Sequence, residues 1–282
     1  MNDKKIIKRS AVLALIWVLI AVIALTSATF AWFTANSKAS TTQMKVNSRR
    51  FNNLTLEISE LGGVAFEAQD EVILNQVNGQ DQMNLMPVST ADLKTFVYCT
   101  ANDEAESSSV FAVLTTETNY YHARFYMMVT SDYDESANVD LFIEGLPFTN
   151  EDGTVSGGIL NAIRLGIVVD DTDTYIFRQS KGADESSNAY LNGELIPANS
   201  VIGVENGEMS VTDDPAVLLG TYTADWTEDG TPETYLMTTR LNEIHKVDLY
   251  IYLEGCDPDC DEEIQLDEFD FELNFFGVKE AD

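Results

Sequence analysis

The residues with the clearest spacing for chemistry lie in an acidic loop near the C-terminus. Asp257, Asp259 and Asp261 form a D-x-D-x-D pattern. Calcium prefers hard carboxylate oxygens, and an EF-hand loop opens with the same spacing. However, Glu262 stands where that loop requires glycine, and the flanks are typical of strands rather than helices. Two hypotheses remain: a weak extracellular calcium site, or an acidic connection between strands, which these departures favour.

The three cysteines are Cys99, Cys256 and Cys260. Because their number is odd, they do not form a complete disulfide framework. Cys256 and Cys260 are close enough to form a disulfide in a tight loop, and such a bond persists outside the cell. Cys99 is then left over, and we expect it to be a small buried hydrophobic residue.

Nothing in the sequence specifies a catalytic centre. The two histidines, His122 and His245, are far apart and belong to no HExxH motif, so they make a poor zinc site. We interpret them as ordinary surface or strand-end residues. The chain also has neither a GxSxG motif nor a phosphate-binding loop. The sequence therefore predicts a protein that is not an enzyme and that has no cofactor other than the hypothetical calcium ion.

The N-terminus predicts export across a bacterial-type cytoplasmic membrane. Residues 1–10 are basic, and residues 11–33 contain no charge, which is long enough to cross a bilayer. Small residues end the run, so a signal peptidase could cut between Ala31 and Trp32. The segment 1–31 is therefore a signal peptide, the favoured interpretation, or a retained anchor. In either case we expect membrane contact only through residues 11–33 and an extracellular or cell-surface location.

The remainder of the chain is strongly acidic. It contributes most of the 47 Asp and Glu residues, against 16 Lys and Arg in the whole chain, for a net charge of −31. Such a surface repels nucleic acid, which we therefore exclude as a partner. Residues 32–50 are the exception, because they are polar and basic, and we interpret them as a linker or an arm that could be donated to another copy.

Residues 51–282 are predicted to form a β-sandwich. Short segments alternate apolar and polar residues, which is typical of strands with one wet face. This pattern predicts an all-β, antiparallel, jelly-roll-like sandwich preceded by one N-terminal hydrophobic helix, with an irregular insertion around residues 180–215. The strand-like segments are 53–59, 71–77, 95–100, 122–130, 139–143, 165–169, 174–177, 216–222, 246–253 and 269–275. We expect 122–130 and 139–143 to form a hairpin, and one helical turn near residue 159.

Two short segments resemble a known family. Ala28-Thr29-Phe30-Ala31-Trp32-Phe33-Thr34 resembles the end of the signal peptides in Gram-positive biofilm-fibre proteins of the TasA and camelysin type. The run from Val247 to Cys260, which contains Tyr252-Leu253-Glu254-Gly255-Cys256, is similar to a C-terminal signature of Firmicutes surface proteins. The resemblance implies a β-sandwich and removal of the leader by a dedicated signal peptidase.

These observations support two functions. The first is an exported structural or adhesive surface protein, as a subunit of an extracellular, biofilm-type fibre that self-assembles by donating the arm. An extended peptide can add to an exposed sheet edge in this way. The alternative is a membrane-tethered or secreted monomeric binding module, with calcium as a candidate requirement and cell-wall or host glycans as candidate ligands.

Overall fold

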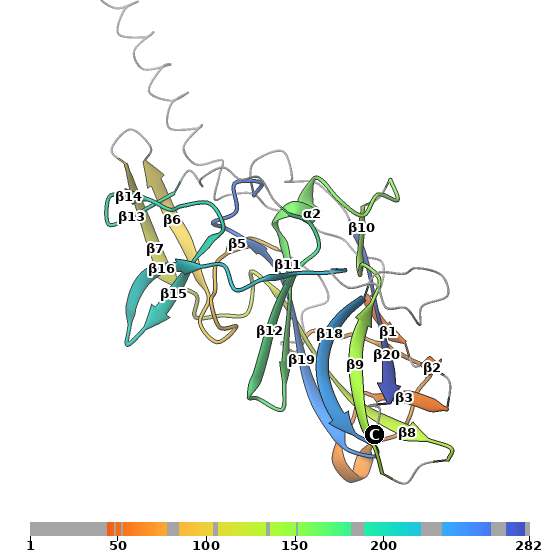
Figure 1. Cartoon of the computed structure of the whole chain (residues 1–282). Helices are drawn as coiled ribbons and strands as arrows, with labels where there is room; N and C mark the ends of the chain where they lie inside the picture. Colours follow the sequence, from red (N-terminus) through yellow and green to blue (C-terminus); the bar gives the residue numbers. More distant parts are fainter. Residues whose placement is uncertain are drawn as a thin grey trace, which may run out of the picture.

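The structure is a computed structural model of the chain (Figure 1). The residues that it describes are 44–47, 49–51, 53–77, 85–103, 107–133, 136–150, 152–181, 189–220, 233–260 and 269–279. The predicted leader, its cleavage site at Ala31 and Trp32, and Asp261 lie outside these residues. No helix within the described part is long and apolar enough to cross a membrane.

Two β-sheets account for most of the described chain. The six-stranded sheet has its main strands in the order β18, β9, β20, β1 and β4, and β10 also pairs with β20. Its strands are β18 (Glu233–Arg240), β9 (Asn138–Glu144), β20 (Phe269–Lys279), β1 (Met44–Asn47), β4 (Glu71–Ile73) and β10 (Phe148–Asn150).

The eight-stranded sheet is centred on the long strands β19 and β8. Its order is β17, β12, β11, β19, β8, β3 and β2, and β5 also pairs with β19. The strands are β17 (Val217–Leu218), β12 (Asp173–Arg178), β11 (Ile163–Val169), β19 (Ile244–Glu254), β8 (Tyr121–Ser131), β3 (Leu54–Ser59), β2 (Arg49–Phe51) and β5 (Pro87–Val88). The short helix α2 (Ile159–Ala162) leads into β11, as predicted, and a 3₁₀ turn, η1 (Gly63–Ala65), follows β3.

The two sheets pack face to face around one large hydrophobic core. Inward-facing residues of both sheets belong to this core, and the rings of Phe125 on β8 and Phe275 on β20 lie 6.3 Å apart between them. Alternate residues of a strand point to opposite faces, so each strand supplies every second side chain to the core. The predicted all-β sandwich is thereby confirmed, and every strand-like segment predicted from the sequence overlaps a strand.

Several details differ from the prediction. The sheets are mixed, because β1 is parallel to β20, β17 to β12 and β5 to β19. The expected hairpin of residues 122–130 and 139–143 is wrong. β8 pairs with β3 and β19 in one sheet, whereas β9 pairs with β18 and β20 in the other. The polar loop between them crosses from one sheet to the other, and a sequence pattern of period two does not distinguish such a crossing from a tight turn.

The predicted irregular insertion around residues 180–215 contains two hairpins within residues 189–215, and these belong to a second region. Three antiparallel hairpins pack beside the sandwich, seen as the yellow and teal ribbons in Figure 1. We call them the three-hairpin lobe; they are β6 (Val97–Asp103) with β7 (Ser108–Val113), β13 (Tyr190–Leu191) with β14 (Glu194–Leu195), and β15 (Ser200–Glu205) with β16 (Glu208–Asp213). Their shared core is small, and its buried members are Val97, Ala189, Ile196, Ile202 and Cys256.

Two of these hairpins turn at an Asn-Gly pair. Asn192 and Gly193 have φ angles of 55° and 83°, and Asn206 and Gly207 have φ angles of 53° and 83°. Two successive positive φ angles define the type I′ turn, whose twist matches that of paired strands and which favours Asn-Gly. The flanking sequences YLNGEL and VENGEM carried this signal, so both hairpins could have been predicted.

Candidate functional site

The first described strand, β1, occupies a slot between β20 and β4. It is parallel to β20, with Met44 opposite Phe271, and antiparallel to β4, with Val46 opposite Val72. Met44 and Val46 are 3% and 0% exposed and point into the sandwich core. The domain therefore begins before residue 51, and the end of the predicted linker 32–50 is a core strand. Polar composition concealed this, because only two apolar side chains are needed in so short a strand.

The outward side of β1 is held by polar contacts. Lys45 Nζ lies 2.9 Å from Glu71 Oε2 on β4. The side-chain amide of Asn47 donates hydrogen bonds to Glu272 Oε1 at 2.8 Å and to Asn274 Oδ1 at 3.0 Å, both on β20. The slot is thus lined by apolar side chains on one face and by acceptors and carboxylates on the other, which suits an extended segment with alternating apolar and basic or polar residues.

Removal of β1 would uncover the β20 edge. Residues 271–274 of β20 would lose their partner on the β1 side, and Phe271 and Leu273, which are 2% and 0% exposed, would lose their apolar neighbours in β1. Unpaired backbone groups at a sheet edge bind an added strand. The slot can therefore accept a strand of the β1 sequence whether it comes from the same chain or from another copy.

The first residue of the acidic loop, Asp257, pairs with a buried arginine. Asp257 is 7% exposed, and its Oδ2 accepts a hydrogen bond from Arg164 Nη2 at 2.7 Å. Its Oδ1 accepts a hydrogen bond from the backbone N–H of Asp259 at 3.0 Å. No group of three potential metal ligands occurs among the described residues. Asp261 lies outside them, so the calcium site at Asp257, Asp259 and Asp261 stays a prediction.

A buried ionic cluster links α2 and β11 with the lobe side of the sandwich. We define it as Arg164, Asp214, Glu254 and Asp257. Arg164 is 2% exposed, and its Nη2 also lies 3.1 Å from Asp214 Oδ2. Burial raises the pKa of Glu254 to about 8, and the charge of Asp214 acts in the same direction. This cluster was not predicted from the sequence, although a single arginine in the apolar run ILNAIRLGIVV was a usable signal.

All three cysteines are free and buried, so the predicted disulfide between Cys256 and Cys260 is absent from the structure. The reason lies in packing, because the Cys256 side chain belongs to the core of the three-hairpin lobe and that of Cys260 to the sandwich core. Burial raises the pKa of the Cys99 thiol to about 12 and that of Cys256 well above its ordinary value. Since the thiolate is the reactive form, neither thiol is activated as a nucleophile.

Both histidines lie at the start of a strand, His122 on β8 and His245 on β19, so the predicted strand-end position is confirmed, but both are buried and the predicted surface position is wrong. His122 is 6% exposed, with Nε2 lying 3.0 Å from Asp248 Oδ1 and its ring stacked on Tyr250 at 4.4 Å. Arg124 Nε also donates to Asp248 Oδ1, at 2.7 Å. Burial alone would raise the pKa of Asp248, but the hydrogen bonds from His122 and Arg124 outweigh it and hold the pKa at about 2.

His245 joins the two sheets. Its Nδ1 lies 2.7 Å from Asp170 Oδ2, and its Nε2 lies 2.6 Å from Thr239 Oγ1. A hydroxyl, an imidazole and a carboxylate in this order are also found in hydrolytic triads. Thr239 is only 3% exposed on β18, however, so its hydroxyl is not accessible to a substrate carbonyl. We interpret the arrangement as a polar link between β18 of one sheet and β19 of the other.

Comparisons with known proteins do not identify the chain. No family model, no curated protein and no solved structure matches it. The chain is therefore classified by its fold alone, as a mixed β-sandwich with a lobe of three hairpins. The resemblance of residues 28–34 and 247–260 to Firmicutes surface proteins stays a prediction.

Proposed function

We propose that the chain is an exported bacterial cell-surface protein, structural or adhesive, that assembles into an extracellular fibre by donating its N-terminal strand. The observation that carries the proposal is the position of β1. It is the first described strand, it follows the predicted cleavage site by a short segment, and it fills an interior slot through only two buried side chains.

Exchange of β1 between copies costs little free energy. A donated β1 makes the same contacts with β20 and β4 as it does within its own chain, so the two states differ mainly in the conformation of the connecting segment and in concentration. The connection between β1 and the rest of its own chain begins at residue 48 and is followed directly by β2, so β2 must leave β3 if β1 is to reach another copy. Residues 48–53 would then form the connection, and six extended residues span up to about 20 Å, which restricts donation to a copy packed directly against the donor.

Charge favours the donated segment over other contacts between copies. Two copies of the chain without residues 1–31, each with a net charge of −34, repel one another, whereas the arm carries Lys38, Lys45, Arg49 and Arg50. The ion pair of Lys45 with Glu71 would form again in the slot of the neighbouring copy.

The first experiment is the N-terminal sequence and mass of the protein recovered from its native cells. A start at Trp32 frees the arm and supports donation. An intact N-terminus would contradict the fibre proposal and would support a membrane-tethered domain instead.

A second experiment tests the slot itself. The mature chain from Trp32 should form filaments or oligomers visible by light scattering and electron microscopy. A variant without residues 32–47 should stay monomeric and bind a synthetic peptide of residues 40–50, but not a scrambled peptide of the same composition. Equal assembly of both chains, or a mature chain that stays monomeric at high concentration, would contradict the proposal.

A further inference from the structure

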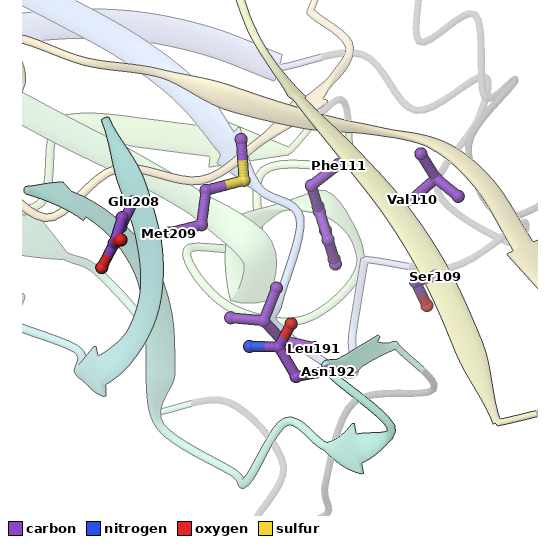
Figure 2. A pocket seen from close by; sticks show the side chains of 7 residues that line it. All are labelled: Ser109, Val110, Phe111, Leu191, Asn192, Glu208 and Met209. Carbon is purple, nitrogen blue, oxygen red and sulfur yellow. The ribbon is translucent and has the colours of Figure 1, made fainter.

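The three-hairpin lobe contains a pocket of about 480 Å³ that lies outside the β1 slot (Figure 2). Its volume falls in the range of small-molecule binding sites. Each of the three hairpins contributes to its wall. The lining residues are Ser109, Val110, Phe111, Leu191, Asn192, Glu208 and Met209.

The apolar part of the pocket comes from three different strands. Phe111 of β7, Leu191 of β13 and Met209 of β16 lie around one space in Figure 2. All three side chains are partly buried and pack against the small core of the lobe. An aromatic ring supported from behind in this way, with one side open to a pocket, offers a flat apolar surface to a ligand.

The polar side chains of the pocket are Ser109, which is hydrogen-bonded within the lobe, and Asn192 and Glu208, which can contact a ligand. Ser109 Oγ donates to Asn102 Oδ1 at 2.6 Å and accepts from the backbone N–H of Tyr190 at 2.9 Å, so it ties two hairpins together. Asn192 and Glu208 are exposed, and their side chains make no hydrogen bond within the described part of the chain. A carboxamide supplies two donors and one acceptor, and a carboxylate supplies acceptors only.

The charge of the pocket restricts its ligand. Among the described residues that line it, Glu208 is the only charged one, and the whole chain has a net charge of −31. An anionic ligand would find no cation among the described lining residues and would be repelled. A cation would gain only a weak, solvent-screened ion pair with the exposed Glu208, so an uncharged ligand suits the pocket best. It must also have one apolar face for Phe111 and several hydroxyl groups for Asn192 and Glu208.

We propose that this pocket binds a neutral saccharide. A pyranose ring has a face of C–H groups, which can stack on Phe111, and a rim of hydroxyl groups, which can hydrogen-bond with the Asn192 amide and the Glu208 carboxylate. The volume accommodates one or two such rings. The proposal is independent of strand donation, because no residue of β1, β4 or β20 lines the pocket.

The test uses the full-length chain, solubilised in a detergent without a sugar headgroup and labelled at its Met and Leu methyl groups. Neutral trisaccharides of glucose, mannose, galactose and N-acetylglucosamine are titrated to millimolar concentration. We expect at least one of them to shift the Met209 and Leu191 methyl resonances in a saturable manner. A trisaccharide of galacturonic acid, which is anionic, should cause no shift.

Matched variants then locate the binding. Asn192→Gly keeps a residue that adopts positive φ but removes the amide, and should weaken binding about fivefold or more. Asn206→Gly makes the same change in the other Asn-Gly turn, outside the pocket lining, and should leave binding unchanged. The proposal is overturned if no neutral trisaccharide shifts these resonances, if the anionic trisaccharide binds equally well, or if the two variants weaken binding to the same extent.

Discussion

The β-sandwich and the three-hairpin lobe differ in how their strands are held. The sandwich encloses one large core between a six-stranded and an eight-stranded sheet, whereas the lobe gathers three two-stranded hairpins around five buried residues. Isolated two-stranded hairpins are marginally stable at best. The lobe therefore depends on its attachment to the sandwich, through Cys256 in its core and through the Ser89 hydroxyl that accepts from the Ile202 N–H at 2.8 Å.

Strand β19 connects the two environments and has a carboxylate in each. Near its start, Asp248 lies beside His122 and Arg124, which hold its pKa at about 2 despite burial. At its end, burial beside Asp214 raises the pKa of Glu254 to about 8. The lowered pKa of Asp248 stabilises the folded state at pH values above the ordinary pKa of an aspartate, and this stability is lost as pH falls through about 2. A raised pKa contributes stability at acid pH that is lost as pH rises through about 8.

The largest expected effect is that of Arg164→Ala. The substitution leaves the carboxylates of Asp214 and Asp257 buried without their cation, and breaking a buried ion pair in this way costs about 3–5 kcal/mol. Urea denaturation should show this loss in the free energy of unfolding, and the lobe should unfold first. Arg240→Ala, at an exposed position of β18, is the control and should stay within about 0.5 kcal/mol of wild type.

The next effect concerns β1. Val46→Ala removes two methyl groups from a side chain that is 0% exposed, and should cost about 1–3 kcal/mol. Because the same side chain would fill the slot of a neighbour, assembly should weaken together with stability. Val64→Ala, at a fully exposed position, should change neither quantity. A Val46→Ala chain that is as stable as wild type and assembles equally well would contradict both the structural role of β1 and its role in assembly.

The comparison of the two carboxylates is sharpened by Glu254→Gln. Since wild-type Glu254 must give up its proton as pH rises through about 8, wild-type stability should fall relative to the variant between pH 5 and pH 9. At pH 9 the variant should be more stable by on the order of 1 kcal/mol. Glu243→Gln on the exposed surface should show no such divergence. Parallel pH profiles for wild type and Glu254→Gln would show that Glu254 is not buried in its neutral form.

The smallest effect is expected for Lys45→Ala. The ion pair of Lys45 with Glu71 is partly exposed, with side chains 35% and 39% accessible, so it should contribute less than about 0.5 kcal/mol. A double-mutant cycle with Glu71→Ala measures the coupling. A coupling above about 1 kcal/mol would mean that the outward side of β1, rather than Met44 and Val46, holds the strand.

The sequence predicted the sandwich because half-buried strands such as 246–253 and 269–275 carry their pattern in consecutive residues. It did not predict the partner of each strand, because β8 and β9 have the same alternation whether they form a hairpin or belong to different sheets. It missed β1, where only Met44 and Val46 are apolar, and β18. The pocket and the ionic cluster arise from residues far apart in the sequence, such as Arg164 and Asp257, which no local pattern relates.

The central claim is that β1 of one copy enters the slot of another, and cysteine cross-linking tests it most directly. Lys45 lies opposite Glu272 on neighbouring strands, a separation that suits a disulfide. Chains that carry only Lys45→Cys are mixed with chains that carry only Glu272→Cys, allowed to assemble and oxidised. We predict disulfide-linked dimers of the two chains, and none when Lys279→Cys, which lies opposite β9, replaces Glu272→Cys. Assembled material without such dimers, from which the double variant yields only cross-links within one chain, would contradict strand donation.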